Sequence, residues 1–342
     1  MTEYAPDTPF EASFPFGATL ELTPFCNFSC VMCYVRLTEE QAKQQGNLLT
    51  AEQWIDIARQ TRDLGTLRLT LTGGEPLFRR DFWEIYHELN QMGFLITILS
   101  NGALIDERVM EKFKQAGMPY AMKLTLYGAS NETYRRVCGS ESGFTRISHA
   151  VDLLRQAQVP FSMTATIVRE NAGDLQEMYR FTRERGIPFQ HTISVVKSAR
   201  GAVNTAESSR FAFYEFTGEL TREVLEQNRH PDSPSPFARC SGYRSSYWMT
   251  WNGHMQLCSF MNRPYVPWQG NLQAAWKALE KELEALQNPP ECAGCPWAAF
   301  CQRCPGILCA ESGDPEKIDQ SLCRTAERLY KIYQTKLKEE EF

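Results

Sequence analysis

The sequence predicts an α/β fold, namely a partial (β/α)6 barrel of the TIM type followed by a small loop-rich region and a C-terminal helix. Strand-like and helix-like segments alternate from residue 17 to about residue 197, which is typical of βαβ units around a parallel sheet. Six units are too few for the closed eight-unit barrel. In such folds, ligands bind where the strands end and the βα loops begin, so we expect the site at that edge.

Each unit begins with an apolar segment that reads as a strand. The six expected strands cover residues 16–22, 67–74, 94–102, 121–128, 161–168 and 189–196. Segments with apolar residues at helical spacing follow the strands, at residues 50–65, 79–93, 106–117, 143–158 and 172–186. Beyond the barrel, helices are expected at residues 204–228, 274–287 and 324–342.

Changes in composition along the chain predict four parts. The segment "NRHPDSPSPFARC" is rich in Pro and Ser and indicates a break before the cysteine-rich end of the chain. We therefore expect an N-terminal extension (1–16), the partial barrel (17–200), a helical linker (201–239) and a second domain (240–342).

Composition narrows the class of protein. The formal net charge is -5 and no basic stripe is present, which argues against nucleic acid or an anionic membrane as partner. The sequence has neither an apolar run long enough to span a bilayer nor the features of a signal peptide, so we expect a cytoplasmic chain. In a reducing compartment, its 12 cysteines indicate metal or cluster ligation rather than disulfides.

The stretch "LTPFCNFSCVMCYVRL" places Cys26, Cys30 and Cys33 directly after the first expected strand, spaced C-x3-C-x2-C. Thiolates bind soft metals and iron-sulfur clusters. Three thiolates on a four-iron cluster leave one iron free, whereas a closed zinc site needs a fourth ligand that is not nearby. The alternative interpretations are a zinc knuckle or thiols that are close by coincidence.

This loop resembles that of the radical S-adenosylmethionine (radical SAM) enzymes. The resemblance implies that Cys26, Cys30 and Cys33 hold a catalytic 4Fe-4S cluster whose free iron is chelated by S-adenosylmethionine. It also implies that an electron, supplied by a flavodoxin- or ferredoxin-type donor, splits the C5'–S bond. The resulting 5'-deoxyadenosyl radical would remove a hydrogen atom from the substrate, while the protein supplies orientation and electrostatics.

Further motifs match the same family in the same order. "TGGEP" ends the second expected strand and is similar to the glycine-rich motif that contacts the methionyl amine of S-adenosylmethionine. "SNG" and "KLTLYG" end the third and fourth strands and match places that present polar groups to the carboxylate and ribose. Arg169 is a weaker candidate, for which a surface arginine is an equally good interpretation. The cofactor-binding residues implied by the resemblance are Tyr34 (near the adenine), Gly73, Gly74, Glu75, Pro76, Ser100, Asn101, Thr125 and Arg169.

The C-terminal cysteines resemble a SPASM domain, which carries two auxiliary iron-sulfur clusters. One departure is that two residues rather than three separate Cys301 from Cys304. By the family's wiring, the first auxiliary cluster is held by Cys240, Cys258 and Cys304, and the second by Cys292, Cys295, Cys301 and Cys323. Either the last iron of the first cluster is open or Cys309 completes it. The alternative is a zinc-ribbon-like domain, since C-x2-C pairs also suit zinc.

Cys138 stands apart from both groups. It is either a hydrogen-atom donor or substrate-side ligand, or a small buried hydrophobic residue, which is the commoner role of a lone cysteine.

Enzymes of this layout mostly modify peptides, so the resemblance implies maturation of a ribosomal peptide by thioether formation, carbon–carbon crosslinking or epimerisation. The chain begins almost at the first strand, so we expect a separate leader-peptide-binding protein or docking on the barrel edge. A sulfatase-maturing, formylglycine-forming enzyme is the alternative, and a non-catalytic iron-sulfur or zinc scaffold is the alternative of another class.

Overall fold

The structure is a computed structural model that describes residues 14–197, 199–201, 206–211, 225–226, 229 and 233–340. The expected N-terminal extension and the expected helical linker therefore lie largely outside the described residues. Within the linker, the short helix α8 (Ala206–Ser209) is described.

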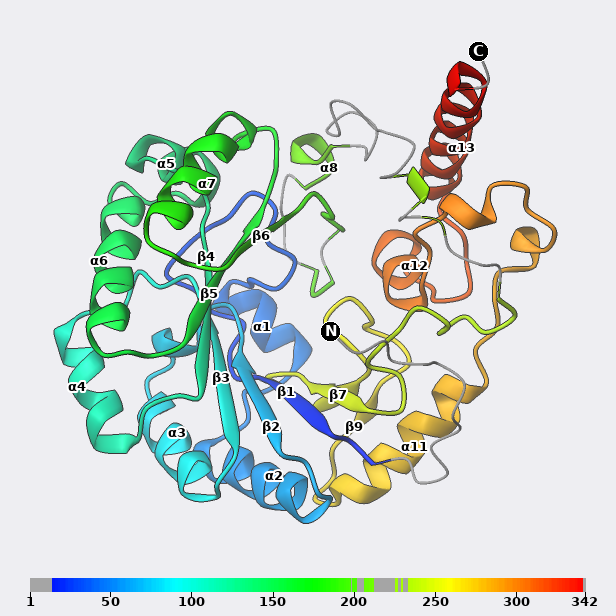
Figure 1. Cartoon of the computed structure of the whole chain (residues 1–342). Helices are drawn as coiled ribbons and strands as arrows, with labels where there is room; N and C mark the ends of the chain where they lie inside the picture. The colour runs from blue at the N-terminus through cyan, green and yellow to red at the C-terminus, as the bar shows by residue number, and fades with distance from the viewer. Residues whose placement is uncertain are drawn as a thin grey trace.

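A nine-stranded sheet organises the described residues, in the order β6-β5-β4-β3-β2-β1-β7-β8-β9. Its first six strands are parallel and adjacent in chain order, which confirms the predicted partial barrel. These strands are β1 (Gly17–Glu21), β2 (Arg68–Thr72), β3 (Leu95–Ser100), β4 (Ala121–Thr125), β5 (Phe161–Thr166) and β6 (Phe189–Thr192). Their carboxyl ends meet at one edge of the sheet, where the βα loops begin (Figure 1).

Helices cover the outer face of the curved sheet, as Figure 1 shows. Those expected from the sequence are α2 (Ala51–Asp63), α3 (Phe82–Gln91), α4 (Glu107–Ala116), α6 (Gly143–Gln156), α7 (Leu175–Glu184), α11 (Leu272–Glu284) and α13 (Gln320–Glu340). Three short helices were not predicted: α1 (Glu39–Gln45), α5 (Asn131–Cys138) and α12 (Pro305–Ser312). Each has at most eight residues, so its apolar periodicity is too short to detect, although Thr38 and Ser130 cap α1 and α5.

The C-terminal region contributes three strands to the same sheet, which the prediction of a loop-rich region did not include. The strand β7 (Ser246–Met249) runs parallel to β1, with Leu20 opposite Met249. Strands β8 (His254–Gln256) and β9 (Val266–Pro267) continue it in antiparallel fashion. Strands of two to four residues carry too little alternation to be read from sequence, and β7 depends on a partner that is distant in the chain.

One apolar core joins the two halves of the chain. Tyr247, Met249 and Trp276 of the C-terminal region are buried in the same cluster as Leu20 and Leu71 of the barrel. The C-terminal cysteines are therefore attached to the barrel through a shared sheet and core. Among the described residues, no helix is long and apolar enough to cross a membrane.

Candidate active site

The loop after β1 carries Cys26, Cys30 and Cys33 and lies at the carboxyl edge of the sheet. Backbone N–H groups point at two of the sulfurs: Phe28 N lies 3.3 Å from Cys26 Sγ, and Arg36 N lies 3.2 Å from Cys33 Sγ. Burial and the charge of the neighbouring Cys30 raise the pKa of Cys33 to about 11. A bound cation would lower such thiol pKa values, because it favours the thiolate that ligates it.

The "TGGEP" turn packs directly on the cysteine loop. Gly74 N donates to Thr23 O at 2.7 Å, and Glu75 N donates to Phe25 O at 2.9 Å. A Cβ added to Gly74 would lie 2.3 Å from Phe25 O, and one added to Gly73 would lie 2.5 Å from Thr23 O. These glycines therefore have a role that the sequence did not indicate: their missing side chains make room for the backbone of the cysteine loop.

Glu75 ties the end of β2 to the end of β3. Its side chain is fully buried and accepts hydrogen bonds from Ser100 Oγ (2.9 Å), Asn101 N (2.8 Å) and Leu77 N (3.2 Å). Burial raises the pKa of Glu75 to about 7, although these hydrogen bonds oppose the shift. The structure thus brings the "TGGEP" and "SNG" motifs together, as the sequence prediction expects.

Asn101 connects this pair of motifs to the first cysteine. Its Nδ2 donates to Asn27 Oδ1 at 2.8 Å and lies 3.6 Å from Cys26 Sγ. Burial of the thiol and the Glu75 charge raise the pKa of Cys26. The predicted residues of β2, β3 and the cysteine loop therefore form one contiguous site.

The remaining predicted cofactor contacts lie in different surroundings. Tyr34 faces the C-terminal region, with its ring edge-on to Phe260 at 5.2 Å. Thr125 is half-buried at the end of β4, and Pro76 is buried at the start of a short 3-10 helix. Arg169 is exposed, and its guanidinium lies 4.7 Å from the centre of the Phe211 ring. The role of Arg169 in cofactor contact therefore stays a prediction.

One contributor to the loop, Arg79, was not assigned from the sequence. Arg79 donates to Leu22 O (2.5 Å) and Leu49 O (2.7 Å) while it is paired with Asp81, so it clamps the end of β1. No motif marks Arg79, because its acceptors are backbone carbonyls far away in the chain.

Cys138 lies beside the cysteine loop rather than alone. The thiol is buried and donates to Tyr134 O at 3.0 Å, as a small buried residue would. Its hydrogen bond with the Cys30 thiol, together with burial, raises the pKa of Cys30. Ser29 N also donates to Cys138 O at 3.0 Å, so the end of α5 supports the loop.

The C-terminal cysteines form two groups. In the first, burial and the charge of Cys304 raise the pKa values of Cys240 and Cys258. A Cβ added to Gly306 would lie 3.0 Å from Cys258 Sγ and 3.9 Å from Cys304 Sγ, so these sulfurs face the start of α12. We call Cys240, Cys258 and Cys304 the first auxiliary group.

The second auxiliary group comprises Cys292, Cys295, Cys301 and Cys323. Burial raises the pKa of Cys292, and the charges of the other three add to this shift. Burial likewise raises the pKa of Cys323, and the charges of Cys301 and Cys295 add to this shift. Cys309 is buried elsewhere, with its thiol 2.9 Å from Asn262 Oδ1. Across the described part of the chain, no three Cys, His, Asp or Glu side chains converge closely enough to hold a single metal ion.

Comparison with known proteins shows the family to which the barrel residues belong. Residues 20–182 match the Radical SAM superfamily. These residues form a radical SAM domain. The match begins in β1 and includes the cysteine loop, "TGGEP" and "SNG", so it covers the contiguous site described above.

Two curated proteins similar to this chain carry different names. The chain is 30% identical to the AdoMet-dependent heme synthase of Methanosarcina barkeri, over 58% of this chain and 58% of the relative. It is 30% identical to the PqqA peptide cyclase of Rhizobium meliloti, over 48% of this chain and 43% of the relative. The chain spans about half the length of the curated relatives it matches.

Solved structures share the fold over nearly the whole chain. Streptococcus suis SuiB bound to S-adenosylmethionine has a TM-score of 0.64 at 17% identity and covers 91% of this chain and 77% of SuiB. The protein anSMEcpe with bound AdoMet has a TM-score of 0.61 at 14% identity and covers 94% of this chain and 100% of anSMEcpe. The fold shared with these solved structures therefore includes the C-terminal region.

Proposed function

We propose that this protein is a radical SAM enzyme that removes hydrogen from a peptide substrate. The observation that carries the proposal is the contiguous site at the carboxyl edge of the sheet. There, the three-thiol loop packs on the "TGGEP" turn, and Glu75 and Asn101 lie beside Cys26. A scaffold protein needs no such open set of three thiols.

The donor set fits the cofactors of the family. Cys26, Cys30 and Cys33 would hold a 4Fe-4S cluster, and three thiolate ligands leave one iron for S-adenosylmethionine. When bound, these two groups supply a radical able to remove a hydrogen atom from the substrate.

The chain's own contribution is to position and shield that site. Gly73 and Gly74 let the loop approach the turn, Arg79 clamps its start, and Asn101 holds Asn27. The Tyr34 ring packs edge-on against Phe260 of the C-terminal region. The contacts to S-adenosylmethionine proposed for Tyr34, Ser100, Asn101 and Thr125 follow the motif resemblance.

We further propose that residues 240–342 form a SPASM domain with two auxiliary clusters. The first and second auxiliary groups described above are the proposed ligand sets, and they agree with the family's interleaved wiring. The position of Cys309 against Asn262 favours the alternative in which the first group has three cysteines. Its remaining coordination position is then available to a substrate group.

A peptide is the proposed substrate because two similar proteins act on or bind peptides by name. These are the PqqA peptide cyclase and SuiB, which has been solved with its precursor peptide SuiA. We propose maturation of a ribosomal peptide, assisted by a separate leader-binding protein and a flavodoxin- or ferredoxin-type electron donor. Formylglycine formation is the second candidate, since anSMEcpe shares the architecture and has been solved with peptides.

The reaction class is tested on anaerobically reconstituted protein and a Cys26/Cys30/Cys33→Ala triple variant. We expect about twelve irons per chain to fall to about eight, with an EPR signal that shifts on adding S-adenosylmethionine only in the native protein. Reduced native protein should form 5'-deoxyadenosine, and the triple variant should not. Equal amounts of 5'-deoxyadenosine from both proteins would refute the enzyme proposal.

The substrate is tested by mass spectrometry of candidate peptides after turnover. A precursor peptide encoded beside this gene should lose two hydrogens per crosslink, whereas a sulfatase-derived cysteine peptide should be converted to formylglycine. Conversion of the sulfatase peptide alone would replace the first candidate by the second. Turnover of neither peptide, with 5'-deoxyadenosine still formed, would reject the peptide proposal and leave the reaction class intact.

A further inference from the structure

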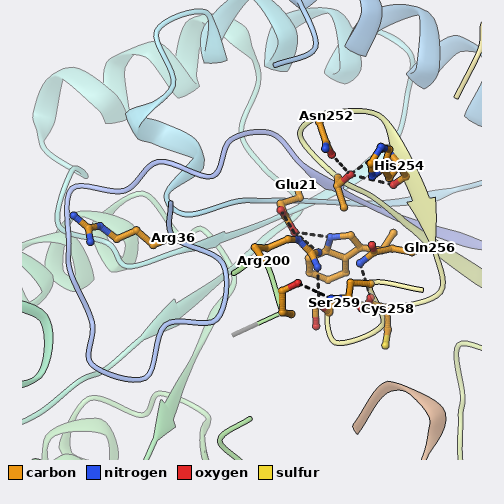
Figure 2. A network of polar contacts seen from close by, with 12 residues as sticks. Glu21, Arg36, Arg200, Asn252, His254, Gln256, Cys258 and Ser259 are labelled. Carbon is orange, nitrogen blue, oxygen red and sulfur yellow. Dashed lines mark hydrogen bonds and ion pairs between the residues drawn. The ribbon is translucent and has the colours of Figure 1, made fainter. Parts of the chain in front are cut away.

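Three segments that are distant in the chain meet around one buried arginine, Arg200. They are the cysteine loop, the segment after β6 and the loop after β8 that carries Cys258 and Ser259. Figure 2 shows Arg200 pointing toward Glu21 on one side and toward Ser259 and Cys258 on the other. Neither motif resemblance nor local pattern assigns a role to Arg200.

Glu21 and Arg200 form a buried ion pair. Glu21 is the last residue of β1 and is 0% exposed, and Arg200 is 7% exposed. The guanidinium binds the carboxylate in a two-pronged arrangement, with Nε–Oε1 at 3.2 Å and Nη2–Oε2 at 2.9 Å. Trp248 Nε1 also donates to Glu21 Oε2 at 2.8 Å, so both carboxylate oxygens are satisfied.

The remaining nitrogen of the Arg200 guanidinium reaches the backbone next to the first auxiliary group. Its Nη1 donates to the carbonyl of Ser259, the residue after Cys258, at 3.2 Å. Burial opposes the charge of Arg200, but the charge and hydrogen bonds of Glu21, with smaller contributions from Tyr34 and Cys258, raise the pKa of Arg200 overall. The guanidinium therefore lies between Glu21 and the loop that carries Cys258 and Ser259 (Figure 2).

The backbone of the same residue holds the cysteine loop. Tyr34 O accepts hydrogen bonds from Ala199 N at 3.1 Å and from Arg200 N at 3.2 Å. Asn262 Nδ2 donates to Ala199 O at 3.2 Å, which adds a second link to the loop after Cys258. One short segment thus contacts both the residue after Cys33 and the loop after Cys258.

A buried ion pair is weak evidence for a purely stabilising role, because desolvation can exceed the attraction. A nearby charge, by contrast, directly changes the reduction potential of an iron-sulfur cluster. A positive charge beside the thiolates favours the reduced, more negative state, and a negative charge opposes it.

We propose that Arg200 is a positioning residue that holds the first auxiliary group against the cysteine loop and raises its reduction potential, while Glu21 limits that increase. This inference rests on the proposed function, because it requires a cluster on Cys240, Cys258 and Cys304. It assigns the Glu21–Arg200 pair to electron transfer rather than to contact with the substrate.

The test is a redox titration, followed by EPR, of full-length protein in the Cys26/Cys30/Cys33→Ala background, so that only auxiliary clusters remain. Arg200→Met should lower the potential of the first auxiliary cluster, and Glu21→Gln should raise it. Arg200→Lys keeps the positive charge, so the potential of the first auxiliary cluster should stay close to that of the background protein. A Cys323→Ala variant, which lacks one ligand of the second group, assigns the two signals.

Arg210→Met is the matched control, because Arg210 pairs with Glu311 at 2.7 Å and also links the segment after β6 to the C-terminal region. It should leave the first auxiliary potential unchanged. Shifts of equal sign in Arg200→Met and Glu21→Gln, or no shift in either, would overturn this inference while leaving the clusters established. Zinc, or about four irons in place of about eight in the background protein, would overturn the auxiliary clusters and this inference together.

Discussion

The two cysteine-bearing regions reach their donor sets by different routes. In the cysteine loop, Cys26, Cys30 and Cys33 lie within eight consecutive residues, and neighbouring elements only shape and bury them. In the C-terminal region, the two auxiliary groups interleave between Cys240 and Cys323, so members of each group come from distant segments. The first arrangement can be read from the chain, while the second exists only after the region has folded.

The difference also applies to the glycines that support each set. A side chain at Gly74 would meet the backbone of the cysteine loop, and that backbone cannot yield unless the whole loop is displaced. Gly306 is tight against the Cys258 side chain, at the start of a helix that supplies Cys304. Substituting each glycine therefore breaks one donor set and spares the other.

The largest expected effect comes from Gly74→Ala. Its Cβ would meet Phe25 O at 2.3 Å and would push the turn away from the cysteine loop. We expect loss of about four of the twelve irons, and a fall in 5'-deoxyadenosine formation of about a hundredfold or more. Gly173→Ala, which meets no atom within 4 Å, is the control. A Gly74→Ala protein with full iron and activity would contradict this role of the turn.

Gly306→Ala should have the next largest effect, and on the other donor set. Alanine favours a helix more than glycine, so any loss reports the contact with Cys258 Sγ at 3.0 Å rather than helix propensity. We expect loss of about four irons, those of the first auxiliary cluster, while cleavage of S-adenosylmethionine persists. Iron analysis and EPR check this; an unchanged first auxiliary signal would show that Gly306 does not line that group.

Glu75 makes the stability of the cluster-free protein depend on pH. Burial raises its pKa from the ordinary 4.5 to about 7, so the folded state holds a proton that the unfolded state releases between these values. The contribution of Glu75 to the free energy of unfolding is therefore full below about pH 4.5. It is lost as the pH rises through 7, by about 3 kcal/mol in total. Urea unfolding at pH 4.5 to 8 should show this fall in native protein and a smaller one in Glu75→Gln, and equal slopes would contradict the assignment.

The smallest expected effect is that of Cys309→Ala. Because its thiol bonds to Asn262 and lies with neither auxiliary group, iron content should not change. Loss of the hydrogen bond should cost about 1 kcal/mol of stability. Cys304→Ala, five residues away in the sequence, should lose the first auxiliary cluster. Iron loss from Cys309→Ala equal to that from Cys304→Ala would restore Cys309 as the fourth ligand.

Much of the fold and of the cysteine loop site could be predicted from sequence. The six strand–helix units and the positions of "TGGEP" and "SNG" at strand ends depend on local periodicity and short motifs. The sequence did not indicate Arg79 or the support of Cys30 by Cys138, because each acts on groups contributed by other elements. Nor did the sequence indicate that the guanidinium of Arg169 lies over the Phe211 ring, because Phe211 belongs to a later segment of the chain.

By itself, the sequence determined which cysteines lie close together in the chain and in what order the strands and helices follow one another. Spacing between neighbouring cysteines and apolar periodicity are local properties of the chain, so they can be read before the chain is folded. Only the tertiary structure decided that β7 joins β1, that Glu75 bonds to Ser100 and Asn101, and that Arg200 reaches Glu21 across 179 positions. Those contacts form when the sheet and the shared core bring distant segments together, and the burial they create sets the charges around both donor sets.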